Sequence, residues 1–124
     1  MSRAMRIAFV VHAVVALVFG LSQFLIPAMS SSWLKWTPVD VTTVRIFGAA
    51  ALGLAVSSWL ASRATSLAEV RIKLWLEMVY GVLGALAGLY QLLFAKAPAA
   101  TWLFVAILGG FGICWIYLYR QAVS

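Results

Sequence analysis

Residues 7–26 read IAFVVHAVVALVFGLSQFLI, an apolar run that contains no Asp, Glu, Lys or Arg and is followed by Pro27. An α-helix rises ~1.5 Å per residue, so ~20 apolar residues cross the ~30 Å hydrocarbon core of a bilayer. Proline removes a main-chain donor and disfavours continuation of a helix. The stretch therefore predicts a membrane-spanning helix that ends at Ile26.

Three further apolar runs follow, and together they predict spans at about residues 7–26, 38–62, 67–94 and 98–120. Thr37-Pro38, with Asp40 as an acid in the first turn, is typical of a helix start, and Ser66 to Glu69 matches a capping box. Pro98 is expected near the first turn of the fourth helix. Short connections make consecutive helices antiparallel. We expect one all-α domain over residues 1–124, a transmembrane four-helix antiparallel bundle in up-down-up-down order.

The composition excludes several classes of protein. The chain is 65% hydrophobic and 10% charged, with a mean hydropathy of +1.06, whereas soluble domains are about 45–50% apolar and about 25% charged. Its net charge is +6, but the basic residues lie at the ends of the apolar runs and form no soluble basic face, so nucleic acid is not expected as a partner. Cys114 is the one cysteine, which excludes disulfide-exchange chemistry by a cysteine pair.

The basic residues also predict the orientation. Lys and Arg concentrate on the cytoplasmic side of membrane proteins. With the N-terminus inside, three basic residues (Lys35, Arg45 and Lys96) face outward, and six face the cytoplasm: Arg3, Arg6, Arg63, Arg71, Lys73 and Arg120. We expect a protein of the bacterial cytoplasmic (inner) membrane with both termini in the cytoplasm. Tryptophans and tyrosines near the span ends are typical of an aromatic belt.

Polar side chains inside spans are functional hypotheses by default. We expect two clusters facing the bundle interior, the first made of His12, Glu77 and Tyr80 with Ser57 and Ser58, the second of Gln23, Arg45 and Gln91. They either form interhelical hydrogen bonds worth ~0.5–2 kcal/mol each, or bind a ligand headgroup or handle protons. A further alternative pairs Glu77 with Arg71 or Lys73 on its own helix.

Between these clusters, the middle of each span carries no ionisable, amide or hydroxyl side chain. A proton-coupled transporter or a channel needs such groups near the midplane, so neither is expected. No catalytic residue, metal site or cofactor is predicted. A minor alternative makes His12 a single axial ligand of haem or a pigment, because a bis-histidine site needs a second histidine that this chain lacks.

Glycines are the main packing signal. Small residues let helix backbones approach closely in membranes, as in the Gly84-x-x-x-Gly88 pattern. We expect helix-packing roles for Gly48, Gly53, Gly81, Gly84, Gly88, Gly109 and Gly112. These exceed the needs of one small bundle, so contacts to a second copy or to another membrane protein are expected.

The stretch VRIFGAAALGLA, residues 44–55, follows a Trp/Pro loop and contains an Arg-x-x-Gly-Ala start to a span. This resembles small four-span bacterial membrane proteins of the broad DoxX-like type. The resemblance covers about a dozen residues and the four-span plan. It implies a small subunit, in some cases of a quinone-dependent oxidation complex, and it carries over Arg45 and Gly48 as helix-packing positions.

The leading prediction is a non-enzymatic small subunit that packs through Gly/Ala-rich helix faces, as a homo-oligomer or in a larger membrane complex. The alternative is a binding or transport protein for a hydrophobic or amphipathic small molecule such as a lipid, quinone or organic cation. An enzyme acting on a quinone or lipid ranks third.

Overall fold

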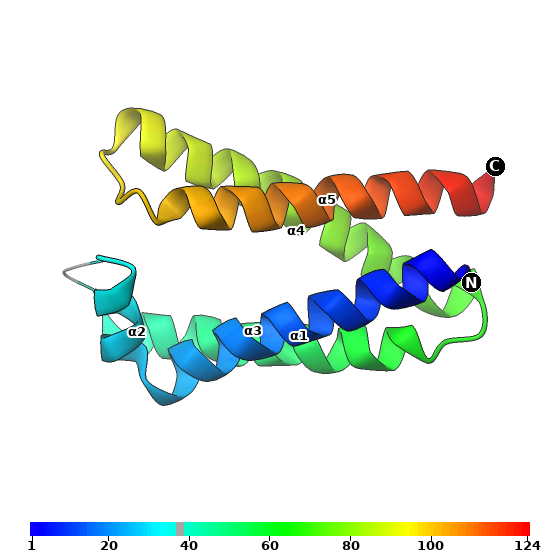
Figure 1. Ribbon diagram of the computed structural model, residues 1–124, viewed down its shortest axis with the longest axis horizontal. Helices are drawn as coiled ribbons and strands as arrows, with labels where there is room; N and C mark the ends of the chain where they lie inside the picture. Colours follow the sequence, from blue (N-terminus) through cyan, green and yellow to red (C-terminus); the bar gives the residue numbers. More distant parts are fainter. Residues whose placement is uncertain (37–38) are drawn as a thin grey trace. The chain divides into compact units, whose positions relative to one another are not determined.

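The computed structural model describes residues 1–36 and 39–124, and the helices in this part of the chain are α1 (Arg3–Leu25), α2 (Pro27–Trp33), α3 (Val41–Ser62), α4 (Leu67–Phe94) and α5 (Thr101–Val123) (Figure 1). Four of them, all except α2, are long and apolar enough to cross a membrane. No strand occurs among the described residues. The predicted all-α class with four membrane-length helices is confirmed.

The start of α4 follows from its capping box. The Ser66 amide donates to the Glu69 carboxylate at 3.0 Å, and the Ser66 hydroxyl lies 2.8 Å from the same oxygen. The bond from the Ser66 amide satisfies a main-chain donor that the start of the helix leaves without an intrahelical partner. The helix therefore begins at Leu67, as the sequence predicts.

The start of α3 differs from the prediction. Asp40 is the N-cap, accepting hydrogen bonds from the Thr42 and Thr43 amides, so the first helical residue is Val41. Asp40 was expected as an acid inside the first turn. The predicted cap at Thr37 and proline at position 38 lie outside the described residues. Bonds from the Thr43 hydroxyl and then from the Thr42 amide lower the pKa of Asp40 below its usual 3.8.

Two further helix ends depart from the sequence prediction. The first connection contains α2, a seven-residue helix that starts at Pro27 and that the apolar pattern did not indicate. Proline suits this first helical position because its missing donor has no intrahelical partner there. Pro98 precedes α5: the Thr101 amide bonds to its carbonyl at 2.9 Å in a turn that leads into the helix.

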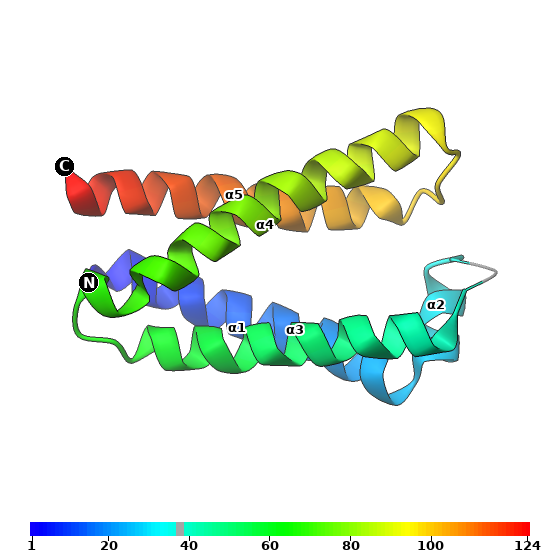
Figure 2. The ribbon, with the colours of Figure 1, turned by 180° about the vertical axis from the view of Figure 1, so that it is seen from behind.

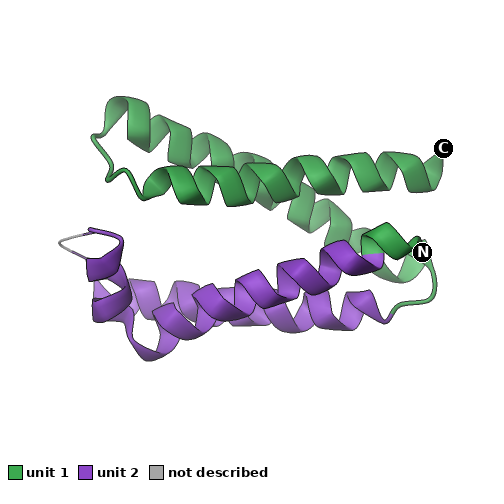
Figure 3. Cartoon of the chain, viewed as in Figure 1, with its two compact units in different colours: residues 1–5, 64–124 green, residues 6–63 purple. Residues whose placement is uncertain are grey.

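The chain forms two compact units, residues 6–63 (unit 2) and residues 1–5 with 64–124 (unit 1), coloured separately in Figure 3. In unit 2, α1 and α3 run antiparallel and side by side, with α2 between them along the chain (Figures 1 and 2). In unit 1, α4 and α5 form an antiparallel helical hairpin. Antiparallel order is thus present within each helix pair.

Buried apolar side chains are few, as expected for helices whose outer faces contact lipid. In unit 2 they are mainly one phenylalanine and small residues: Phe9, Ala13, Ala16, Ala55 and Ala61. In unit 1 all but Ala64 are larger: Met5, Val70, Leu74, Met78, Trp115 and Leu118. Small residues at a helix contact let α1 and α3 approach closely.

Candidate functional site

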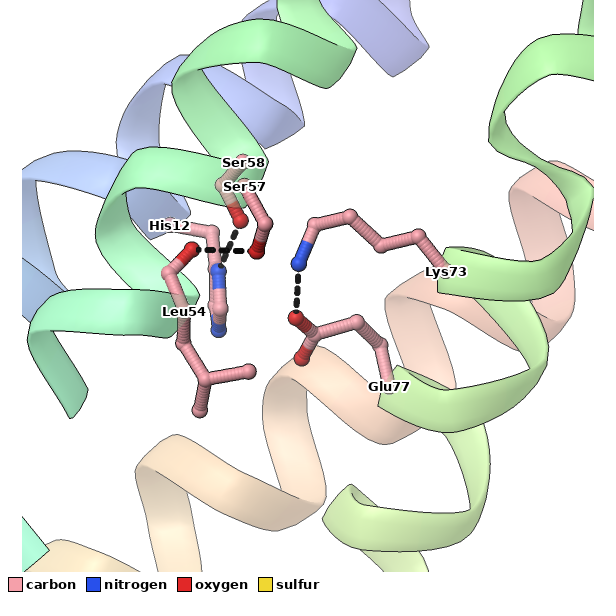
Figure 4. A network of polar contacts seen from close by, with 6 residues as sticks. All are labelled: His12, Leu54, Ser57, Ser58, Lys73 and Glu77. Atoms are coloured by element: carbon pink, nitrogen blue, oxygen red, sulfur yellow. Dashed lines mark hydrogen bonds and ion pairs between the residues drawn. The ribbon is translucent and has the colours of Figure 1, made fainter. Parts of the chain in front are cut away.

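His12 of α1 and Ser58 of α3 form a buried polar pair in unit 2. The imidazole Nδ1 lies 2.7 Å from the Ser58 hydroxyl, and the two side chains are 8% and 0% exposed (Figure 4). Ser57, the neighbouring hydroxyl, donates instead to the Leu54 carbonyl of its own helix at 3.0 Å. Of the serines predicted beside His12, Ser58 is therefore its hydrogen-bond partner, and the bond joins two helices.

Glu77 and Lys73 form an ion pair within α4, one helical turn apart. Their charged atoms are 2.5 Å apart, and the side chains are 2% and 13% exposed (Figure 4). Among the alternatives for Glu77, the same-helix partner Lys73 is present, and Arg71 is exposed. Tyr80 is half exposed. The predicted cluster of His12 with Glu77 and Tyr80 joins residues of different units and stays a prediction.

Arg45 connects the start of α3 to the end of α1. Its Nε donates to the main-chain carbonyl of Phe24 at 3.1 Å. The last turn of α1 contains no basic residue of its own, so Arg45 supplies the positive charge that a helix C-terminus favours. Gln23, predicted beside Arg45, is the residue next to Phe24 and is partly exposed, and Gln91 is exposed in unit 1.

Gly48 explains how Arg45 reaches α1. A β-carbon built on Gly48 would lie 2.5 Å from the Phe24 amide nitrogen, closer than real β-carbons approach. Only glycine permits this backbone contact. Arg45 lies three residues earlier, hence on the same face of α3. The two residues of the Arg-x-x-Gly pattern therefore work together: Gly48 permits the close approach of α3 to α1, and Arg45 bonds to the main chain at the end of α1.

Glycines of α4 and α5 make a similar close contact in unit 1. A β-carbon on Gly81 would lie 2.8 Å from both the Gly112 Cα and the Leu108 carbonyl oxygen. On Gly84 and Gly88 it would lie 2.7 and 2.6 Å from side-chain methyls of Leu108 and Val105. Gly109 and Gly112 are less tight, with nearest neighbours at 3.5 and 3.3 Å. The five glycines predicted on these two helices all lie at the α4–α5 contact.

Gly53 of α3 behaves differently from the other glycines predicted to pack. Apart from its chain neighbours and the adjacent backbone of its own helix, no atom of the described residues lies within 4 Å of a β-carbon built on it, and the same holds for Gly110 of α5. Both residues are exposed. Conversely Gly20, which the sequence analysis did not select, lies against α3: its β-carbon would be 2.9 Å from the Leu52 amide nitrogen. The sequence around these glycines does not show which of them contacts a neighbouring helix; the structure does.

Two buried hydroxyls were also not predicted. Ser31 of α2 and Thr101 at the start of α5 are buried, and neither hydroxyl oxygen has a hydrogen-bond partner among the described residues. Buried hydroxyls are normally hydrogen-bonded, so these two are exceptions to the usual pattern in the described part of the chain.

No group of three or more His, Cys, Asp or Glu that suits a metal ion occurs within residues 1–36 and 39–124. Cys114 is a partly buried free thiol in α5. The axial-ligand role for His12 stays a prediction.

No protein-family model matches the chain, and neither the curated proteins nor the solved structures contain a significant match to it. The resemblance to DoxX-like proteins therefore stays a prediction from residues 44–55.

Proposed function

We propose that this chain is a small non-enzymatic subunit of the bacterial cytoplasmic membrane, with both termini in the cytoplasm. It associates with further copies or with a larger membrane complex through the exposed small-residue faces of α3 and α5. The observation that carries the proposal is the pair of open glycines, Gly53 and Gly110, each at the centre of an exposed helix face.

On α3, the face around Gly53 has the spacing of a helix-contact seam. Its members recur at alternating steps of three and four residues, and all are exposed: Ile46, Ala49, Gly53, Val56 and Leu60. This is the a/d repeat with which helices interdigitate. Ala49-x-x-x-Gly53 places two small residues one turn apart at its middle, which lets a partner backbone approach.

On α5, the face around Gly110 repeats the arrangement with the same steps. Its members are Leu103, Ala106, Gly110, Ile113 and Tyr117, again all exposed. Ala106-x-x-x-Gly110 is the small pair. Each unit thus presents one seam, with large residues at both ends and small residues at the centre.

The exposed faces of α1 and α4 are built differently, which favours protein contact over lipid contact for the two seams. Along α1 the exposed apolar residues are large, such as Val14, Leu17 and Leu21, and on α4 they include Leu83 and Leu86. Large side chains fill the space beside lipid tails, whereas a glycine within a helix costs about 0.5–1 kcal/mol relative to alanine and calls for a compensating contact.

Cysteine cross-linking in reconstituted bilayers tests self-association. In a Cys114→Ser background, Ala49→Cys or Ala106→Cys should form disulfide-linked dimers, because equivalent seam positions meet across a two-fold contact. Val14→Cys on the exposed face of α1 is the matched control and should stay monomeric. Equal cross-linking at all three positions would indicate random collision and contradict the proposal.

Purification from native membranes in mild detergent tests the larger-complex form. Gly53→Leu and Gly110→Leu should each weaken the association more than tenfold, as judged by the mass of the purified particle, while circular dichroism remains helical. Val14→Leu should have no effect. A monomer without partners, and with a mass unchanged by either glycine variant, would overturn the proposal and favour the alternative of a binding protein for an amphipathic small molecule.

A further inference from the structure

Two residues other than glycine have a left-handed backbone in the described part of the chain, and both are lysines. Lys35 has φ 56° and Lys96 has φ 52°, while no glycine has a positive φ. Residues that carry a side chain rarely adopt this backbone conformation, because their β-carbon comes too close to the neighbouring carbonyl oxygen. Glycine is the usual residue at such positions.

Both lysines occupy the same place, directly after the cap of a helix. Lys35 follows α2, and the Trp36 amide then folds back onto the Ser31 carbonyl at 2.9 Å. Lys96 follows α4, and the Ala97 amide folds back onto the Gln91 carbonyl at 3.2 Å. Glycine would form either turn without the β-carbon penalty, so the lysine side chains have a role beyond ending the helices.

An exposed aromatic ring lies two residues before each lysine. Trp33 is 65% exposed, and Phe94 is 73% exposed with its ring centroid 5.2 Å from that of Tyr90. Lys35 and Lys96 are themselves exposed, and neither ammonium makes an ion pair or hydrogen bond with any residue of the described ranges. Each unit therefore has an exposed cation without a partner among the described residues and an exposed aromatic ring two residues earlier in the chain.

The position of these pairs along the chain indicates what they meet. Each lies between two membrane-length helices that run antiparallel within one unit, so each is at a membrane surface. At that depth aromatic rings lie among the headgroups, and lysine side chains extend toward them. The charge opposite an ammonium there is the phosphate of a phospholipid, which attracts a cation most when the lipid carries net negative charge.

We propose that Lys35 with Trp33, and Lys96 with Phe94 and Tyr90, each bind the headgroup of one anionic phospholipid. The ammonium pairs with the phosphate, and the ring packs against the glycerol and upper acyl chain. The left-handed backbone fixes the direction of the lysine relative to the helix that carries the ring. This inference is independent of the proposed association through α3 and α5.

Native mass spectrometry of the full chain in mild detergent provides the test. The protein is titrated with phosphatidylglycerol and, separately, with phosphatidylcholine of the same acyl chains. The double variant Lys35→Gly/Lys96→Gly should weaken phosphatidylglycerol binding about fivefold, the ratio that corresponds to ~1 kcal/mol for one ammonium–phosphate pair. Lys35→Gly and Lys96→Gly should each weaken the binding of one of the two lipids. Binding of phosphatidylcholine should not change. Because glycine suits the left-handed backbone, these variants keep the fold intact.

Two further variants separate a specific site from general charge. Lys35→Arg retains the cation and should keep at least half of the phosphatidylglycerol affinity. Arg71→Gln removes an exposed positive charge of α4 that lies outside any left-handed turn, and it should weaken phosphatidylglycerol binding less than the double glycine variant does. The proposal is overturned if the double glycine variant binds phosphatidylglycerol as the unmodified protein does, if Arg71→Gln loses as much affinity as the double variant, or if the loss is equal for phosphatidylglycerol and phosphatidylcholine.

Discussion

The replacement of Gly81 by alanine should separate the α4–α5 hairpin by a defined amount. The added β-carbon would lie 2.8 Å from the Gly112 Cα and from the Leu108 carbonyl oxygen, and both are backbone atoms that cannot rotate away. Reaching the 3.4 Å of an ordinary contact requires a shift of about 0.6 Å between the two helices. The strain is therefore shared by every side chain that packs near this crossing.

The magnitude follows from that shift. A gap of 0.5–1 Å removes roughly a quarter to a half of each affected dispersion contact, and overpacked sites lose about 1–3 kcal/mol. Alanine recovers up to about 1 kcal/mol through its better helix propensity. We therefore expect Gly81→Ala to lower the free energy of unfolding by about 1–2 kcal/mol.

Gly53→Ala is the matched control, because a β-carbon there meets no described atom within 4 Å beyond its chain neighbours and the adjacent backbone of its own helix. It should leave stability unchanged or raise it by up to about 1 kcal/mol. Reversible unfolding in mixed detergent micelles, followed by circular dichroism, measures both variants at a dilution that prevents association. If Gly81→Ala were as stable as Gly53→Ala, the close α4–α5 contact would not exist in solution and the reasoning would be refuted.

Three other outcomes are expected. Ser58→Ala should destabilise the protein by about 0.6–2 kcal/mol, because it removes the hydroxyl that bonds to the buried His12 Nδ1. If Ser58→Ala were as stable as the unmodified protein in the same unfolding assay, the hydrogen bond would be contradicted. Lys35→Gly and Lys96→Gly should each raise the free energy of unfolding by up to about 1 kcal/mol, because glycine has no β-carbon to strain the left-handed backbone. A lower free energy of unfolding in either variant would show that the lysine backbone is not strained. Asp40 has a pKa lowered in the folded state, so its contribution is present above the ordinary value of 3.8 and is lost as the pH falls from there through the lowered pKa. The protection factors of the amide hydrogens at the start of α3 should therefore decrease in that acid range. Asp40→Asn should abolish this pH dependence of the protection factors while keeping a side chain that caps the helix.

The Arg45–Gly48 pair shows how far a short pattern predicts geometry. The sequence placed both residues at the start of a span, and their separation put them on one helix face. It did not identify the acceptor, which is a main-chain carbonyl at the end of α1. A carbonyl is present in every residue, so no side-chain pattern distinguishes the one that a remote arginine reaches.

Local sequence was sufficient to predict the four apolar helices and the capping box before α4, because these depend on residues close together in the chain. The tertiary structure alone decided which glycines are contact positions: Gly20 and Gly81 lie against a neighbouring backbone, whereas Gly53 and Gly110 do not. It also decided that Ser58, and not Ser57, bonds to His12. The reason is that contact depends on how each helix is rotated about its axis and where it crosses its partner. A rotation of one residue, about 100°, exchanges an inner face for an outer one without changing the local sequence.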